Sequence, residues 1–344
     1  MPYPEQISSV VELEDLLARP SAAGIEMMRA LEGDLMILGI AGKMGLTLGS
    51  LAQQSAKLAG VNKRIIGVSR FSRPEERRKL ESWGIECIAC DLLDRAAVAS
   101  LPQCRNVIYM AGRKFGTGGE EELTWAMNAL APAIVAEHFK QSRIVVFSTG
   151  CVYPLQKAHD CGSRETQAPA PVGEYAQSCL ARERLFQYCS NKNDSSLLFF
   201  RLNYAVDLRY GVLHDIAQRI WQGQPVDNSV PHFNVIWQGD ANDIALRALQ
   251  ITARPAEILN VTGPELVSVE QCAAFFAQRF GKAVSFCGQP GQPGYLSNSA
   301  KMAKLFGYPR VSLQTLLEWQ ADWTAKSLPS LNKPTHFEVS DGKF

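Results

Sequence analysis

Short apolar segments alternate with amphipathic stretches along the chain as far as residue 202. The apolar segments predict strands at residues 35–39, 64–68, 85–89, 107–111, 143–148 and 196–201. Helical patterns separate them at residues 46–59, 75–83, 121–139 and 174–190. Strands that are apolar throughout are typical of a parallel sheet covered on both faces. The alternation therefore predicts an α/β fold with a doubly wound parallel sheet of the Rossmann type.

A glycine-rich turn joins the first predicted strand to the helix that follows it. Its three glycines are spaced three residues apart, which permits a tight turn and lets the backbone approach a bound group. Free N–H groups and the helix dipole at a helix N-terminus favour anions. We therefore expect Gly39, Gly42, Lys43, Met44 and Gly45 to bind the pyrophosphate of a dinucleotide.

The ends of the second and third strands frame the expected adenosine end of this site. An acidic residue after the second strand would hold the ribose hydroxyls of NAD, but this chain has Ser69 and Arg70 there. These residues suit a 2′-phosphate, so we expect a preference for NADP over NAD. Alternatively, Arg70 is a solvated cation and the pocket accepts either cofactor. Asp91 and Leu92 are predicted to face the adenine, although Asp91 equally fits the cap of a turn.

Composition and charge narrow the range of partners. The chain has 344 residues, of which 46% are hydrophobic, and a net charge of +1, so a small-molecule ligand is expected rather than nucleic acid or a membrane surface. No apolar run has the length of a membrane span, and the N-terminus lacks a signal-peptide pattern. The nine cysteines lie mostly in apolar segments, so we expect reduced thiols and a cytoplasmic protein. Cys87 and Cys90 are interpreted as strand residues, and no metal site is expected.

The pattern loosens after residue 202, which indicates a second region and two terminal segments. The predicted divisions are an N-terminal helical extension at 1–33, an NAD(P)-binding Rossmann domain at 34–202 with a returning segment near 235–262, a smaller substrate-binding lobe at 203–234 and 263–328, and a C-terminal arm or loose tail at 329–344.

Several motifs occur together in an order that resembles a known family. They are the glycine turn, Asp91, Tyr109–Gly112, Asn128, Ser148–Tyr153, Tyr175, Arg201–Tyr204, Gln238–Ala245 and Ile258–Gly263. As a set they resemble the extended short-chain dehydrogenase/reductases, the NAD-dependent epimerase/dehydratase family, over about residues 34–326. The resemblance implies a Rossmann domain with a C-terminal substrate lobe, bound NAD or NADP, and a homodimer formed by the helices at 121–139 and 174–190. Family members oxidise a sugar carbon, rearrange it and often reduce it again.

The resemblance also implies contacts for particular residues. Met110, Ala111, Gly112 and Asn128 would contact the cofactor, and Asn203 would lie at the substrate site.

Thr149 and Tyr175 are the catalytic residues that the resemblance implies. Thr149 would hold the substrate hydroxyl, and Tyr175 would act as the general base. In the family, a lysine one helical turn after the tyrosine lowers its pKa and holds the nicotinamide ribose. Here Cys179 replaces that lysine, either as a structural residue or as a nucleophile without an evident base. Gly150 and Cys151 stand where 4,6-dehydratases have an Asp-Glu pair, so this dehydration is not expected.

A cation from elsewhere could compensate for the missing lysine. Arg113 and Lys114 follow the fourth strand, at the edge where ligands bind in open α/β sheets, and the glycine-rich run 116–119 comes next. They are interpreted either as contacts to the nicotinamide or a substrate anion, or as solvated loop residues. Arg182, seven residues after Tyr175, is expected to lie too far away.

Two functions are compatible with these residues. The first is an NAD(P)-dependent oxidoreductase or epimerase acting on a sugar, nucleotide-sugar or sugar-acid derivative through Thr149 and Tyr175. The second is a catalytically silent dinucleotide-binding protein that senses or scaffolds. A cation close to Tyr175 would favour the first function.

Overall fold

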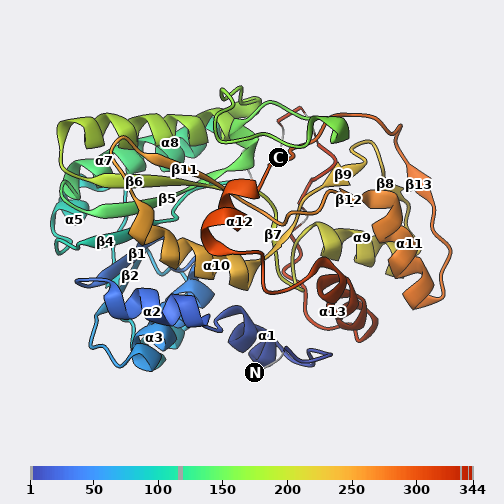
Figure 1. The fold of residues 1–344 in the computed structure, drawn as a ribbon, viewed down its shortest axis with the longest axis horizontal. Helices are drawn as coiled ribbons and strands as arrows, with labels where there is room; N and C mark the ends of the chain where they lie inside the picture. Colours follow the sequence, from blue (N-terminus) through green and yellow to red (C-terminus); the bar gives the residue numbers. More distant parts are fainter. Residues whose placement is uncertain (1–2, 115–118, 334, 340, 343–344) are drawn as a thin grey trace.

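A seven-stranded parallel sheet lies at the centre of the protein (Figure 1). The computed structural model describes residues 3–114, 119–333, 335–339 and 341–342. The strand order is β11-β6-β5-β4-β1-β2-β3, which confirms the predicted doubly wound fold. The strands are β1 Leu35–Leu38, β2 Ile65–Ser69, β3 Glu86–Ala89, β4 Asn106–Tyr109, β5 Arg143–Thr149, β6 Ser196–Leu202 and β11 Glu257–Val261.

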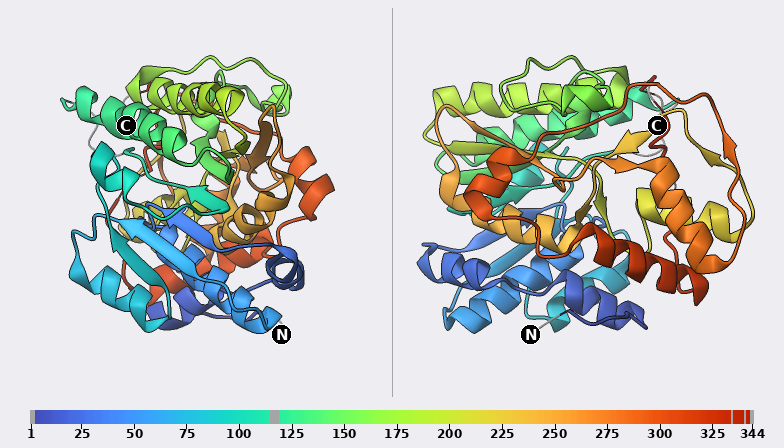
Figure 2. Two further views of the ribbon diagram at one scale, coloured as in Figure 1. Left: turned by 90° about the vertical axis from the view of Figure 1, so that its left-hand side faces the viewer. Right: turned by 45° about the vertical axis from the view of Figure 1, so that its right-hand side comes forward.

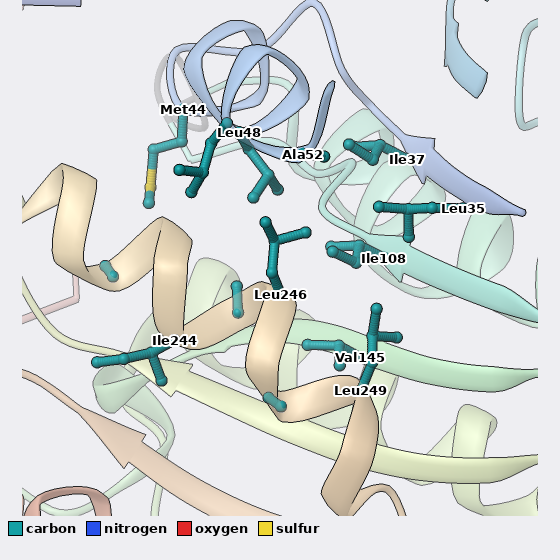
Figure 3. Close-up of a cluster of buried hydrophobic side chains, with 14 of the residues drawn as sticks. Leu35, Ile37, Met44, Leu48, Ala52, Ile108, Val145, Ile244, Leu246 and Leu249 are labelled. Atoms are coloured by element: carbon teal, nitrogen blue, oxygen red, sulfur yellow. The ribbon is translucent and has the colours of Figure 1, made fainter. Parts of the chain in front are cut away.

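The side chains of alternate strand residues pack into two separate hydrophobic cores, one on each face of the sheet. In β1, Leu35 and Ile37 point to one core, and Met36 and Leu38 point to the other. The first core is covered by α2, α3 and α10. Figure 2 shows the blue N-terminal helices on this face of the sheet, and Figure 3 shows side chains of α3 and α10 against those of β1, β4 and β5. The second is covered by α5, α7 and α8. The bounds are α2 Ala22–Ala30, α3 Gly45–Ala59, α4 Pro74–Ser82, α5 Arg95–Ala99, α7 Ala131–His138, α8 Gly173–Lys192 and α10 Gln238–Arg247.

The N-terminal extension is built into both halves of the molecule. It contains α1 (Val10–Leu17) and α2, each capped by a serine side chain, as helix N-termini prefer. The apolar side chains of α1 join the core of the C-terminal lobe, whereas those of α2 join the core beneath the sheet. The hydroxyl of Ser21 also donates to Asp243 of α10 at 2.8 Å. The extension therefore helps to hold the lobe against the sheet.

The long helix expected at 121–139 contains a π-helical turn. It runs as α6 (Glu121–Trp125), a π segment (Ala126–Leu130) and α7. Pro132 has no N–H to donate to the carbonyl of Asn128, so the α-helical ladder is interrupted at this point. The wider turn lies at Asn128, one of the predicted site residues.

The C-terminal lobe packs at the carboxyl end of the sheet (Figure 1). Its main helices are α9 Val212–Trp221, α11 Val269–Phe280 and α13 Leu313–Ala325, and α12 Ala300–Phe306 packs against β11. Short strands accompany them: β7 Ala205–Val206, β8 Val226–Asp227, β9 His232–Phe233, β10 Ile236–Trp237, β12 Val267–Ser268 and β13 Phe286–Cys287. The returning segment supplies α10 and β11, and β11 extends the sheet beside β6. Within the described ranges, no helix is both long and apolar enough to cross a membrane.

The C-terminal tail differs from the loose arm that its polar sequence suggested. The backbone N–H and the hydroxyl of Thr335 donate to Asp215 of α9 at 2.8 and 2.5 Å. Phe337 is buried and lies 6.0 Å from Phe233, ring centre to ring centre. Widely spaced apolar and hydroxyl side chains anchor the tail, and a composition argument does not detect such contacts.

Candidate active site

The three glycines of the turn between β1 and α3 have different roles. Gly39 has a φ of +89°, and a Cβ there would lie 2.7 Å from the backbone nitrogen of Ala111. A Cβ on Gly45 would lie 2.2 Å from the carbonyl oxygen of Ile40. Gly42 is exposed, and a Cβ there would meet only the carbonyl oxygen of Gly39, at 3.2 Å. Gly39 and Gly45 are thus required for packing, whereas Gly42 leaves backbone open to a ligand.

The N-terminus of α3 fits an anionic group. Its N-cap residue, Met44, supplies no side-chain hydrogen bond to the first turn. The N–H of Gly45 donates to the carbonyl of Gly42 at 3.0 Å, so an anion would be held by the helix dipole and by the N–H groups that follow Gly45. Pyrophosphate binding at this turn stays a prediction, and the side chain of Lys43 lines the second cavity described below.

A cavity of about 290 Å³ adjoins the open face of the glycine turn. Its lining includes nine of the residues expected to bind the cofactor: Gly39, Gly42, Ser69, Arg70, Asp91, Leu92, Met110, Ala111 and Gly112. They come from the loops after β1, β2, β3 and β4, which meet at the carboxyl edge of the sheet. The residues present therefore fit a dinucleotide, and we call this cavity the cofactor pocket.

The expected adenosine end of the cofactor pocket also contains Arg73 and Glu76. Arg73 forms an ion pair with Glu76, which also lines the pocket. Burial raises the pKa of Glu76, while Arg73 acts in the opposite direction. Asp91 lines the pocket and also accepts a hydrogen bond from the N–H of Leu93 at 3.0 Å. Its position therefore fits both the predicted contact to the adenine and the cap of a turn.

Asn128 is fully engaged by protein partners. Its side chain accepts from the N–H of Arg113 and donates to the carbonyl of Arg113, both at 2.8 Å. It also donates to Ser178 at 3.0 Å and accepts from Arg182 at 2.8 Å. These bonds fix the loop after β4, so the geometry gives Asn128 a positioning role, whereas its direct contact to a cofactor stays a prediction.

A second cavity of about 140 Å³ lies beside the ends of β5 and β6, and we call it the substrate cavity. It brings together the predicted residues Met44, Lys114, Thr149, Tyr175 and Asn203. It also contains residues that the sequence analysis did not place there: Lys43, Cys151, Tyr204, Tyr210 and Thr335. The glycine turn borders both cavities, because Gly42 lines one and Met44 the other.

The phenol of Tyr175 is held in its neutral form. Burial raises the pKa of Tyr175 well above its ordinary value, and the nearby thiols of Cys179 and Cys151 raise it further. The charge of Arg182 and a hydrogen bond with Thr149 act in the opposite direction. Tyr175 is therefore protonated at neutral pH in the unliganded protein.

Cys179 has the properties of a structural residue. It is 1% exposed and packs among Val152, Tyr153 and Tyr175. Burial raises the pKa of its thiol to about 11, so the reactive thiolate is scarce at neutral pH.

Arg182 is closer to the site than its sequence spacing suggested. It is buried, donates to the carbonyl of Phe147 at 2.8 Å, and lowers the pKa of Tyr175 electrostatically. Side chains of a helix lean toward its N-terminus, so a long side chain two turns onward reaches back toward the tyrosine. Arg182 was expected to lie too far from Tyr175. It acts on the phenol through its charge and is not among the described residues that line the substrate cavity.

The side chains of Arg113 and Lys114, which follow β4, have different surroundings. Arg113 forms an ion pair with Glu120. Lys114 lines the substrate cavity, and burial lowers its pKa, while Cys151, Cys179 and Asp215 act in the opposite direction. Residues 116–118 of the glycine-rich run lie outside the described residues.

Lys43 reaches the substrate cavity from the glycine turn. Its ammonium nitrogen lies 3.4 Å from the ring centre of Tyr210, in a cation–π contact. Burial lowers the pKa of Lys43 to about 7, Asp207 opposes this shift, and Lys114 adds to it. A cation inside the glycine motif is visible in the sequence, but its direction depends on Tyr210, which is distant along the chain.

The fold is of the Rossmann type, with two neighbouring cavities at the carboxyl edge of the sheet. The sequence profile of the NAD dependent epimerase/dehydratase family matches residues 35–206, and the chain belongs to this family.

Solved structures with the same fold cover 86% of this chain. They include MoeE5 in complex with UDP-glucose and NAD (19% identity, TM-score 0.69, 99% of that chain covered). They also include UDP-glucuronic acid 4-epimerase from Bacillus cereus with UDP-glucuronic acid and NAD (17%, 0.69, 99%), and UDP-glucose 4-epimerase from Thermus thermophilus with NAD (19%, 0.68, 100%). At these identities the likeness shows the fold. No curated protein matches the chain.

Proposed function

We propose that this protein is an NAD(P)-dependent oxidoreductase or epimerase that acts on a sugar, nucleotide-sugar or sugar-acid derivative. One observation carries the proposal: Thr149, Tyr175 and Lys114 line a single cavity that shares the glycine turn with the cofactor pocket. The similar structures with bound NAD and nucleotide sugars support it at the level of the class of reaction.

Tyr175 is the proton donor in this proposal. Because its phenol stays protonated at neutral pH, it suits donation to the oxygen of a substrate carbonyl. Thr149 forms a hydrogen bond with the phenol and orients it. A bound nicotinamide cofactor supplies the hydride. The site is thus best suited to reducing a ketone or aldehyde, and Gly150 and Cys151 offer no carboxylate for a 4,6-dehydration.

Two cations share the task of the missing lysine. Lys114 supplies positive charge inside the substrate cavity, and Arg182 supplies it from beneath Tyr175. Both favour negative charge that develops on a substrate oxygen during proton transfer. Cys179 packs against Val152, Tyr153 and Tyr175.

The preferred cofactor in this proposal is NADP. Ser69, Arg70 and Ser72 line the adenosine end of the pocket and can donate to a 2′-phosphate. Arg73 offsets the charge of Glu76, the acid that would otherwise repel that phosphate. Calorimetry with both cofactors tests this preference, and tighter binding of NAD would overturn it.

We also propose a homodimer in a reducing compartment such as the cytoplasm. Large apolar side chains are exposed on the helices expected to form the interface: Trp125, Leu130 and Tyr188. All nine cysteines are free thiols, as is usual for a protein kept reduced. Sedimentation of the wild type and of Leu130→Glu tests the dimer.

Turnover decides whether the protein is an enzyme. NADPH oxidation is followed at 340 nm with keto sugars, keto sugar acids and nucleotide-linked sugars. We expect Tyr175→Phe to lower the rate by about 100-fold or more, because one proton donor contributes that much to catalysis. Equal rates for wild type and Tyr175→Phe would contradict the proposed role.

The competing function is a catalytically silent dinucleotide-binding protein. The replacement of the lysine by Cys179 and the raised pKa of Tyr175 are the observations that favour it. NADP binding without turnover of any compound in the panel would support this function.

A further inference from the structure

Two lysines line the substrate cavity. Among the described residues that line it, Lys43 and Lys114 are charged, and none is a carboxylate. They approach from different elements, the glycine turn and the loop after β4. Burial lowers the pKa of both amines, and the charge of Lys114 lowers the pKa of Lys43 further. An anion between them would relieve both costs.

Lys43 is held in the direction of this cavity. Its ammonium lies against the ring of Tyr210, which also lines the cavity. Such a contact favours a charged amine and limits the freedom of a long side chain. The anion-binding arrangement therefore exists before a ligand arrives, which reduces the entropic cost of binding.

The size of the cavity limits what can carry the anionic group. At about 140 Å³ it has half the volume of the cofactor pocket and lies below the range of about 300–1,000 Å³ that drug-sized ligands occupy. Thr335 of the tail contributes to the wall and is fixed by two hydrogen bonds to Asp215. The part of the substrate that this space encloses is therefore compact.

We infer that the substrate is a compact organic acid with hydroxyl groups, such as a free sugar acid, whose carboxylate binds between Lys43 and Lys114. This inference rests on the proposed function and names the substrate class for the same site. Thr149 and Tyr175 then face a hydroxyl or carbonyl carbon of the acid, and Asn203 lies on the wall beside them. Lys43 is a specificity-determining residue in this arrangement, because it recognises the carboxylate and not the reacting carbon.

Calorimetry on the NADP-loaded protein tests this inference. Each acid is paired with the neutral polyol of the same carbon skeleton: D-erythronate with erythritol, and D-gluconate with D-glucitol. UDP-glucose is the nucleotide-sugar probe. We expect at least one acid to bind about tenfold or more tightly than its polyol, as a charge-assisted contact provides. UDP-glucose should bind more weakly than that acid.

Lys43→Met and Lys114→Met should each bring the affinity for the acid close to that of the polyol. Lys304→Met, which removes an exposed lysine of α12, is the matched control and should leave the difference intact. Equal affinities for acids and polyols, absent binding of both acids, or tighter binding of UDP-glucose would each overturn the inference.

The same samples separate this inference from the proposed function. Acid binding that depends on both lysines, without hydride transfer at 340 nm, would support the inference and contradict the enzyme. Turnover of neutral or nucleotide-linked sugars that is insensitive to Lys43→Met would support the enzyme and overturn the inference.

Discussion

The cofactor pocket and the substrate cavity are neighbours, yet they are assembled in different ways. The cofactor pocket draws its walls from loops that follow successive strands of one sheet. The substrate cavity combines the glycine turn, the loop after β4, α8, the lobe and the tail, from Lys43 to Thr335. The first is open and carries charges of both signs, whereas the second is half as large and holds two lysines.

This difference teaches where specificity resides in the molecule. A pocket made by the strand order of a sheet is available to any chain with that fold. A cavity whose walls come from a lobe and a tail changes with a few substitutions at those walls. We therefore expect the fold to dictate the class of cofactor and the tertiary contacts to dictate the substrate.

The largest loss of stability is expected at the buried ion pair between Arg201 and Glu183, which adjoins the substrate cavity. Arg201 donates to Glu183 at 2.7 and 2.9 Å, and Ser148 of the cavity wall donates to the same carboxylate at 2.6 Å. Arg201→Met leaves the carboxylate of Glu183 buried without its cation, so the free energy of unfolding should fall by about 3–5 kcal/mol. Denaturant unfolding measures this loss.

The matched control for this variant is Arg254→Met. Arg254 pairs with Asp194 on the surface at 3.0 Å, so its removal should cost less than about 1 kcal/mol. Similar losses for the two variants would show that burial of the pair does not determine its contribution.

Gly42→Asp should affect the cofactor pocket, which Gly42 lines, and not the substrate cavity. A Cβ there would lie 3.2 Å from the carbonyl oxygen of Gly39, so a small backbone adjustment is needed and the melting temperature should fall only slightly. A carboxylate there would face the pyrophosphate, and affinity for NADP should fall by about 100-fold or more. Binding is measured by fluorescence titration with NADPH, and Gly42→Ala, with no charge, should show a much smaller loss. Unchanged affinity in Gly42→Asp would place the dinucleotide elsewhere.

Binding of an acid should take up a proton at pH 8. Lys43 has a pKa of about 7 and faces Asp207, Lys114, Arg209 and Lys333, so it is mostly neutral at that pH. A bound carboxylate favours its charged form and raises its pKa, and affinity therefore falls as the pH rises from 7. Calorimetry in buffers of different ionisation enthalpy measures the uptake, which Lys43→Met should abolish.

The lowered pKa of Lys43 also makes the stability of the fold depend on pH. Because Lys43 has its ordinary pKa of about 10.5 in the unfolded chain and about 7 in the fold, its charge destabilises the fold fully below pH 7. This cost disappears as the pH rises toward 10.5. Lys43→Met should therefore raise the melting temperature of the unliganded protein most below pH 7, and a lowered temperature there would contradict the assigned burial.

The smallest effect is expected for Cys179→Ala. Removing a buried thiol leaves a small void and should cost about 1 kcal/mol of stability. Turnover should change by less than about twofold, because a neutral thiol contributes little to proton transfer. Tyr175→Phe is the control that must lose activity in the same assay. A loss in Cys179→Ala as large as that in Tyr175→Phe would assign chemistry to the thiol.

Much of the cofactor side could be predicted from the sequence. The apolar strands, the glycine spacing and the residues after each strand predicted the sheet and assigned Ser69 and Asp91 to one pocket. The substrate side could be predicted only in part. Thr149 and Tyr175 followed from the family resemblance, but the burial of Arg182 and the anchoring of Thr335 did not. A polar tail and a distant arginine carry no local signal of where they pack.

The sequence by itself determined the order of strands and helices, and with it the edge of the sheet where ligands meet, because hydrophobic periodicity and right-handed connections act locally along the chain. Only the tertiary structure decided that Lys43 turns toward Tyr210, that Lys114 enters the cavity while Arg113 pairs with Glu120, and that the tail completes the wall. Side-chain direction depends on partners that are far apart in sequence, and those partners become neighbours only when the lobe packs against the sheet.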